Sequence, residues 1–199
     1  SLLAEDATLT IPGYVKDAVK SCRLFFVENE RTTRRFFKQL WKEMVIDDYE
    51  WVNMSDISKV SDIFKQKIKE GKAIGIVSEA GCPGVADPGQ ALVAIAQEMG
   101  ATVKPLVGPS AILLALMASG MNGQQFRFLG YLPIDSPQRA KTIKDLETES
   151  FKKNFTQIFI ETPYRNNQLL EALIQHCKAS TRLCIAVDIT GKNEMIRTM

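Results

Sequence analysis

The stretch that decides the fold is Ser78-Glu79-Ala80-Gly81-Cys82-Pro83-Gly84-Val85-Ala86-Asp87-Pro88-Gly89. It follows a short apolar run ending at Val77 and leads into a helical pattern that starts at Pro88. Three glycines and two prolines leave little side-chain bulk, so backbone groups can approach a ligand closely. The stretch fits neither the P-loop pattern GxxxxGKS/T nor the dinucleotide pattern GxGxxG. We interpret it as a ligand-binding loop; a purely structural turn is the alternative.

On both sides of this loop, short apolar runs alternate with longer helical patterns, which is typical of an α/β fold. Most of the expected strands are continuously apolar, as strands covered on both faces are. They are residues 24–27, 73–77, 102–107, 126–129, 157–160 and 183–189. The expected helices are residues 12–21, 32–44, 56–70, 88–99, 111–119, 137–149 and 163–178. Three of these helices follow Asp87-Pro88, Ser136-Pro137 and Thr162-Pro163, where a side-chain oxygen can cap the helix before a proline.

The chain is expected to form two domains. Residues 130–149 follow a strand, turn, and become highly charged, which indicates a hinge region. We place the boundary after residue 122, so that 1–122 form an N-terminal αβα domain and 123–199 a second one. We expect both ends of the chain to be incomplete. The sequence begins at residues 1–3 without the apolar run of a first strand, and it stops at residues 195–199 inside a strand-like pattern.

Composition limits the classes of function. The net charge of +2 is too small to decide for or against nucleic acid. The four cysteines form no CxxC pair, so we expect a reducing, cytoplasmic location and no metal site. The longest apolar run, residues 111–118, is far shorter than the roughly 20 residues that span a bilayer, so no membrane span is expected.

Polar residues also follow three other expected strands, at the sheet edge where open α/β folds bind ligands. They lie in VENER at 27–31, VGPSA at 107–111 and IETPYR at 160–165. Each has a structural alternative: Ser110 and Thr162 can cap helices, and Arg165 can be a surface residue.

Six motifs resemble those of one family. SEAGCPGVADPG is similar to SDAGTPGxSDPG, VGPSA to PGPSA, FRFLGYLP to FxFxGFLP, IFIETPYR to YESPHR, VENERTTRRF to AEDTRxTRxL, and AVDITGKNE to ARELTKxxE. They occur in the same order in the ribosomal RNA (cytidine-2′-O)-methyltransferases of the tetrapyrrole methylase superfamily. The chain departs from the family at Glu79, Cys82, Tyr164 and Gly191, and in the tetrad Glu28-Asn29-Glu30-Arg31. The family's glycine-rich loop after its first strand has no counterpart here.

The resemblance implies a fold of two αβα domains with a cofactor cleft between them, usually in a homodimer. It implies that S-adenosyl-L-methionine lies against Ser78, Glu79, Ala80, Gly81, Cys82, Pro83, Pro109, Ser110 and Ala111, with Ile160, Glu161 and Thr162 contributing from the second domain. No metal is implied.

The expected reaction is methyl transfer to a ribose hydroxyl, in which a positioned base can add roughly 10²–10⁴-fold. Glu28 is the first candidate for this base and Glu161 the second, while Arg31 can orient a phosphate or pair with a carboxylate. RNA is the expected partner, and its phosphates can be contacted by Arg31, Arg34, Arg35, Lys38 and Lys42, which recur every three or four residues. A solvated helix face explains the same spacing. Two further functions remain open: methylation of a small, tetrapyrrole-like molecule, and cofactor binding without catalysis.

Overall fold

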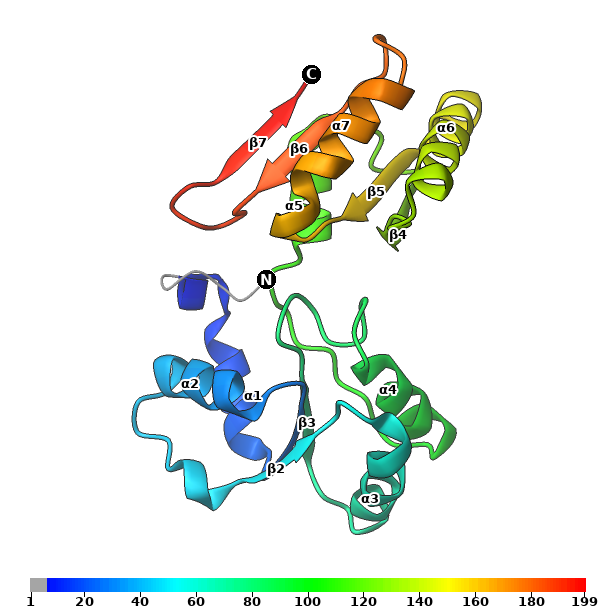
Figure 1. The fold of residues 1–199 in the computed structure, drawn as a ribbon. Coiled ribbons are helices and arrows are strands. Elements are labelled where there is room, and N and C mark those ends of the chain that lie inside the picture. The colour runs from blue at the N-terminus through cyan, green and yellow to red at the C-terminus, as the bar shows by residue number, and fades with distance from the viewer. Residues whose placement is uncertain (1–6) are drawn as a thin grey trace. The chain divides into compact units, whose positions relative to one another are not determined.

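The computed structural model describes residues 7–199, which form two compact units (Figure 1). The first contains the chain up to Ser110 with Thr190–Lys192, and the second contains Ala111–Ile189 with Asn193–Met199. The sequence places the change of domain twelve residues later, after 122. The difference is helix α5 (Ala111–Ser119), which contacts strand β7 (Met195–Thr198) through a 2.8 Å hydrogen bond from Thr198 Oγ1 to Ser119 O.

The first unit is built on a parallel sheet of three strands in the order β2-β1-β3. The strands are β1 (Leu24–Val27), β2 (Glu50–Asn53) and β3 (Ile74–Val77). In the register of the sheet, Phe25 of β1 is paired with Trp51 of β2 on one side and with Gly75 of β3 on the other. All four residues of β1 are buried, as expected for a strand covered on both faces.

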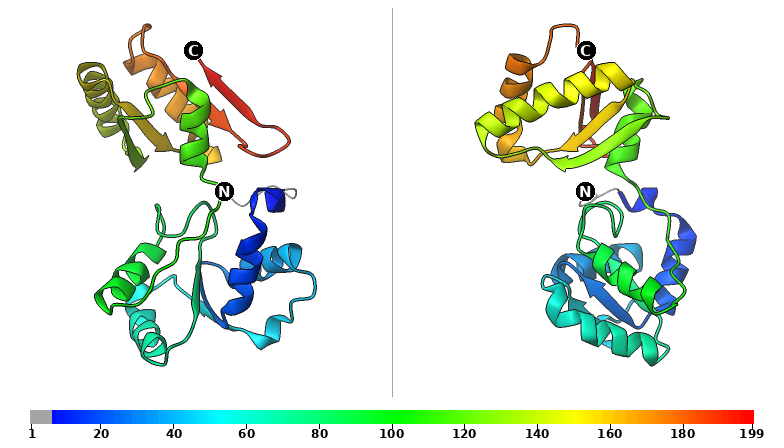
Figure 2. Two further views of the ribbon diagram at one scale, coloured as in Figure 1. Left: turned by 180° about the vertical axis from the view of Figure 1, so that it is seen from behind. Right: turned by 90° about the vertical axis from the view of Figure 1, so that its right-hand side faces the viewer.

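Helices cover both faces of this sheet, so the first unit has three layers in the order helices, sheet, helices (Figure 2). Leu24 and Phe26 face α3 (Ile57–Lys69) and α4 (Gly89–Glu98), where they pack in one apolar core. Phe25 and Val27 point the other way, toward α1 (Gly13–Ser21) and α2 (Glu30–Leu40). The alternation follows from the two-residue period of a strand. Two short 3₁₀ turns, η1 (Ala7–Thr10) and η2 (Ile46–Asp48), complete the unit.

Two expectations for this unit are wrong, and one strand was not expected. Residues 102–107 form no strand: the segment is exposed, and Pro105 has no N–H to donate to a ladder. Strand β2 was not expected, because its sequence, Glu50-Trp51-Val52-Asn53, has only two apolar residues between two polar ones and gives no continuous apolar run. Helix α2 ends at Leu40 rather than Met44; the chain turns at Trp41, and Met44 enters the core from a turn.

The second unit contains α5, two pairs of strands and two longer helices. Strands β4 (Phe126–Tyr131) and β5 (Thr156–Ile160) are parallel, and β6 (Cys184–Val187) pairs with β7 in antiparallel fashion. Helices α6 (Ser136–Lys153) and α7 (Asn166–His176) share an apolar core with Leu132, Phe159 and Leu183. A 3₁₀ turn, η3 (Pro163–Arg165), precedes α7. The chain is thus an α/β protein, as expected.

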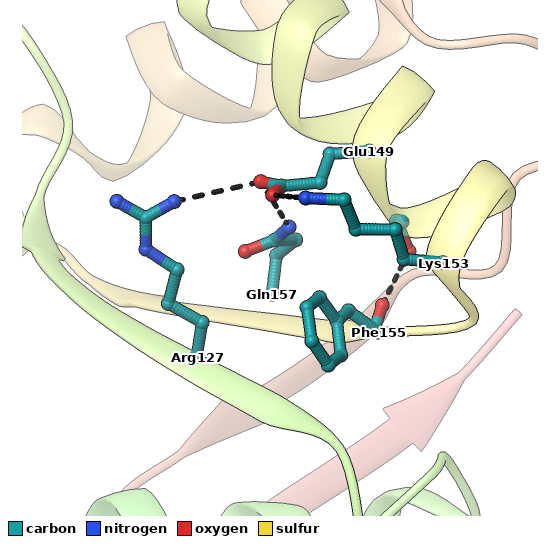
Figure 3. Close-up of polar contacts among 6 residues, drawn as sticks. Arg127, Glu149, Lys153, Phe155 and Gln157 are labelled. Atoms are coloured by element: carbon teal, nitrogen blue, oxygen red, sulfur yellow. Dashed lines mark hydrogen bonds and ion pairs between the residues drawn. The ribbon is translucent and has the colours of Figure 1, made fainter.

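Polar contacts fix α6 against β4 and β5 (Figure 3). Glu149 of α6 forms ion pairs with Lys153 at 2.9 Å and Arg127 of β4 at 3.5 Å, and it accepts a 3.2 Å hydrogen bond from Gln157 of β5. The cap at the start of α6 is Asp135, which accepts from Gln138 N at 3.0 Å, and not Ser136 as expected. None of the helices in residues 7–199 is long and apolar enough to cross a membrane.

We expect the free energy of unfolding to depend on pH through Glu147 of α6. Hydrogen bonds from the Thr181 hydroxyl and from Lys178 N lower the pKa of this carboxyl below its ordinary value of 4.5. A lowered pKa in the folded state contributes stability above the unfolded pKa, and that stability is lost as the pH falls through the folded pKa. We expect Glu147→Gln to flatten the loss of stability below pH 4.5, measured by urea unfolding at several pH values. The exposed Glu171→Gln is the control, and equal pH profiles for both variants would contradict the prediction.

Candidate functional site

The carboxyl ends of the three parallel strands are joined by side chains. Asn53, the last residue of β2, donates from Nδ2 to the carbonyl of Glu28 at 3.0 Å. The Glu28 carboxylate, one residue beyond β1, accepts the backbone N–H of Glu79 through Oε2 at 2.7 Å. Glu79 lies two residues beyond β3. A continuous connection therefore runs across this edge of the sheet and ends on the glycine-rich loop.

The glycine-rich loop, residues 78–89, is organised by Asp87. Its Oδ1 accepts the N–H groups of Gly84 and Gly89, both at 2.7 Å. Gly81 and Gly84 have φ values of +78° and +81°, in the left-handed region that favours glycine. Ser78 adds a 3.2 Å hydrogen bond from its hydroxyl to the carbonyl of Gly81. The loop is a defined structure rather than a loose connection.

Asp87 was expected to cap α4, but Pro88 holds the cap position and Asp87 instead closes the loop. Replacing Asp87 by alanine removes the acceptor of two amides, one of them on the buried Gly89. We expect the free energy of unfolding to fall by about 1–3 kcal/mol, the cost of a buried donor without a partner. Urea unfolding measures this change. Asp62→Ala is the control, because Asp62 is 90% exposed and only pairs with Lys65; equal losses would contradict the structural role of Asp87.

A second segment, residues 107–110, approaches the glycine-rich loop. The Cys82 thiol lies 3.9 Å from the carbonyl oxygens of Gly108 and Pro109, within the range of a weak sulfur hydrogen bond. The Tyr14 hydroxyl of α1 accepts the N–H of Val107 at 2.8 Å. The structure therefore brings together the two segments of the first unit that carry expected cofactor residues. Ala111 already belongs to α5 of the second unit.

The two loops leave open space at their glycines. A Cβ added at Gly81 or Gly108 would have no neighbouring atom within 4 Å. Without side chains at these two positions, the backbone of Gly81 and Gly108 can be approached closely from the side where a Cβ would point. Such a surface can hold a ligand through main-chain contacts.

In the second unit, the expected residues after β5 form a compact ion pair. Glu161 Oε1 accepts from Arg165 at 2.5 Å and from Thr162 N at 2.8 Å, and the Glu161 side chain is only 8% exposed. The Arg165 guanidinium also lies over the ring of Tyr131, 5.7 Å from its centroid. The Thr162 hydroxyl faces Glu161 and does not cap the following turn, contrary to expectation. The Glu161 carboxylate is thus buried and bound by Arg165 and Thr162 N. Ile160 is the last residue of β5.

Helix α2 starts directly after Glu28. Asn29 caps it by accepting the N–H groups of Arg31 and Thr32 at 3.1 and 3.3 Å. Arg31 does not pair with Glu28; within residues 7–199 it forms no ion pair. The expectation that Lys42 shares a face of this helix is wrong, because the helix ends before it.

Sequence reasoning missed Asn53 and Tyr14. Asn53 ends a strand that the sequence did not reveal, so its place at the sheet edge could not be inferred. Tyr14 contacts a segment more than ninety residues later, and nothing local in the sequence signals that contact. Both residues position parts of the site: Asn53 binds the carbonyl of Glu28, and Tyr14 binds the N–H of Val107.

Comparison with known proteins gives consistent matches. The family model of the tetrapyrrole (corrin/porphyrin) methylases matches residues 11–199. The ribosomal RNA small subunit methyltransferase I of Vibrio cholerae is 31% identical over 186 residues, covering 92% of this chain and 61% of the relative. The proteins of the same name in Bacillus subtilis and Escherichia coli O157:H7 are 38% and 36% identical, covering 64% and 65% of this chain. The chain spans about three fifths of the Vibrio relative and less than half of the other two.

Proposed function

Because the chain belongs to the tetrapyrrole (corrin/porphyrin) methylase family, we propose that it transfers a methyl group from S-adenosyl-L-methionine to a ribose 2′-hydroxyl of small-subunit ribosomal RNA. The relatives' names supply the RNA class. The observation that carries the proposal is the joined pair of loops beside Glu28: a bare backbone surface lies next to a carboxylate at the carboxyl edge of a parallel sheet. This is the edge at which α/β proteins bind their ligands.

The donor would be held mainly by main chain. In this proposal, Ser78–Pro83 and Pro109–Ala111 contact S-adenosyl-L-methionine, and Ile160, Glu161 and Thr162 contribute from the second unit. The bound donor supplies an electrophilic methyl group on a sulfonium. The open positions at Gly81 and Gly108 fit such a ligand, because no side chain of the loop occupies the space around them.

The protein's own contribution is position and proton removal. Glu28 Oε2 is held by Glu79 N, which fixes the orientation of the carboxylate. Its Oε1 makes no hydrogen bond within residues 7–199 and can accept the proton of the attacking hydroxyl as the oxygen–methyl bond forms. Holding the acceptor in line supplies much of the rate, and a positioned base adds roughly 10²–10⁴-fold. Arg165 keeps the Glu161 carboxylate engaged, so Glu28 is the first candidate for the base.

A transfer assay tests the proposal. The protein is incubated with S-adenosyl-L-methionine labelled in the methyl group and with in-vitro-transcribed small-subunit ribosomal RNA, and the labelled nucleotide is mapped. We expect label on a ribose, and none when that nucleotide is replaced by its 2′-deoxy form. Label on a base, or on a small-molecule fraction only, would overturn the assignment of the acceptor. Donor binding without any transfer would instead support a non-catalytic binding protein. The homodimer and the cytoplasmic location stay predictions.

A further inference from the structure

Helix α2 presents two arginines on the side opposite its core. Arg31 and Arg35 are one turn apart, both exposed, while Thr33 and Phe37 on the other side are buried. Four residues of helix advance about 6 Å along the axis, so the two guanidinium groups start from neighbouring points on one line. We call Arg31 and Arg35 the α2 arginine pair.

The other cations of this helix are already engaged. Arg34 forms an ion pair with Glu30 and lies over the ring of Trp51, with its guanidinium carbon 5.3 Å from the centroid. Lys38 donates from Nζ to the carbonyls of Lys42 and Met44, at 2.6 and 2.8 Å. These contacts stabilise the first unit. Within the part of the chain that the structure describes, neither member of the α2 arginine pair forms an ion pair or a contact with an aromatic ring.

The position of Arg31 does not favour the helix. It lies in the first turn, where the helix dipole is positive and a cation is destabilising. The acidic residue of that turn, Glu30, already forms an ion pair with Arg34. Arg31 is exposed and pairs with no carboxylate in residues 7–199, so its guanidinium is free to bind an anion outside the protein.

The α2 arginine pair also lies close to the candidate site along the chain. Arg31 is three residues after Glu28, and its own N–H is held by the capping residue Asn29. The surface therefore begins at the edge of the sheet where Glu28 binds the glycine-rich loop. A nucleic-acid strand contacting α2 would pass beside that loop.

We propose that the α2 arginine pair contacts two phosphates of the RNA strand that carries the methyl acceptor. This inference rests on the proposed function and names the surface through which the RNA is held. Arginine suits this role because its guanidinium can donate two parallel hydrogen bonds to a phosphate. Charge on the phosphates, rather than base identity, would be recognised, so the contact positions the strand without selecting its sequence.

The test compares RNA binding at several salt concentrations. The probe is in-vitro-transcribed small-subunit ribosomal RNA, titrated into the protein, into Arg35→Gln and into Arg31→Gln/Arg35→Gln. Each phosphate contact to a single strand contributes about 0.7 to the slope of log affinity against log salt. We expect the slope to become less steep by about 0.7 in the single variant and about 1.4 in the double variant. The affinity at low salt should fall on the order of tenfold in the double variant.

A charge-matched control removes two lysines from α3 and its end. Lys69 and Lys72 are exposed in the same unit, so Lys69→Gln/Lys72→Gln changes the net charge equally. Equal slopes for this control and the α2 double variant would overturn the inference while leaving the proposed function standing, provided that the unmodified protein binds and methylates the RNA. Failure of the unmodified protein to bind the RNA would overturn both. Thermal stability of Arg31→Gln should be unchanged or higher, whereas a clear loss would indicate a structural role for Arg31.

Discussion

Replacing Glu28 by glutamine is expected to lower the rate of methyl transfer by about 10²–10⁴-fold, equivalent to about 2.7–5.4 kcal/mol of transition-state stabilisation. The substitution removes the charge that accepts a proton. The glutamine side-chain oxygen can still accept the N–H of Glu79, so the glycine-rich loop should keep its position. Cofactor affinity should therefore stay nearly the same. Single-turnover transfer and calorimetry with S-adenosylhomocysteine measure the two quantities.

Glu28→Ala separates the two roles of this side chain. Alanine removes the acceptor of the Glu79 amide, and loss of a hydrogen bond to a charged group costs about 1.5–3 kcal/mol. We expect lower transfer, weaker cofactor binding and lower stability together. Glu43→Gln, at an exposed position in the same unit, is the control for loss of one charge. An unchanged single-turnover rate in Glu28→Gln would remove Glu28 as the base and make Glu161 the next candidate.

A methyl group added at Gly75 should cause a large loss of stability, because it would enter the core around Phe25. Its Cβ would lie 2.4 and 2.6 Å from two ring atoms of Phe25, distances at which something must move. Phe25 is 1% exposed, and its ring is held by Phe37 and Trp51 at centroid distances of 5.0 and 5.2 Å. We expect Gly75→Ala to lower the free energy of unfolding by about 3 kcal/mol, the upper part of the usual range for overpacking. Urea unfolding measures it.

Gly13→Ala is the matched control for Gly75→Ala. A Cβ at Gly13 meets nothing within 4 Å, and this residue starts helix α1 without a positive φ. Alanine should therefore leave the free energy of unfolding unchanged or raise it by up to about 1 kcal/mol. A loss at Gly75 no larger than that of an ordinary surface substitution would show that the Phe25 core can rearrange, which contradicts the packing described above.

Local patterns in the sequence were sufficient for the helices and for most strands. Leu24–Val27 is a continuous apolar run because both of its faces are covered, and α5 has the predicted bounds, Ala111–Ser119. Segments whose structure depends on distant partners were not predictable. Glu50–Asn53 becomes a strand only because β1 lies beside it, whereas residues 102–107 stay outside the sheets, where Pro105 cannot donate to a neighbouring strand.

In the candidate site, too, the residues could be expected from local sequence, whereas the contacts between them could not. Strand ends and small residues pointed to Ser78–Pro83, Pro109 and Glu28, but not to how they are connected. The bond from Glu79 N to Glu28 spans 51 residues, and the contact of Cys82 with Pro109 spans 27. Asp87 was recognised as a helix-capping type, yet its position between Gly84 and Gly89 lets its carboxylate accept the amides of both instead. Tertiary contacts of this kind leave no periodic signal.

The central claim is that the glycine-rich loop of the first unit binds the methyl donor. Its most direct test is calorimetry of the protein with S-adenosylhomocysteine, for the unmodified protein, Gly81→Val and Gly71→Val. Both glycines have a positive φ and an open Cβ position, at +78° and +69°, so valine imposes similar backbone strain at each. Only Gly81 lies in the loop, whereas Gly71 directly follows Glu70, the C-cap of α3. We predict saturable heat for the unmodified protein and Gly71→Val and a large loss of affinity in Gly81→Val. No heat with the unmodified protein, or equal affinities in the two variants, would contradict the claim.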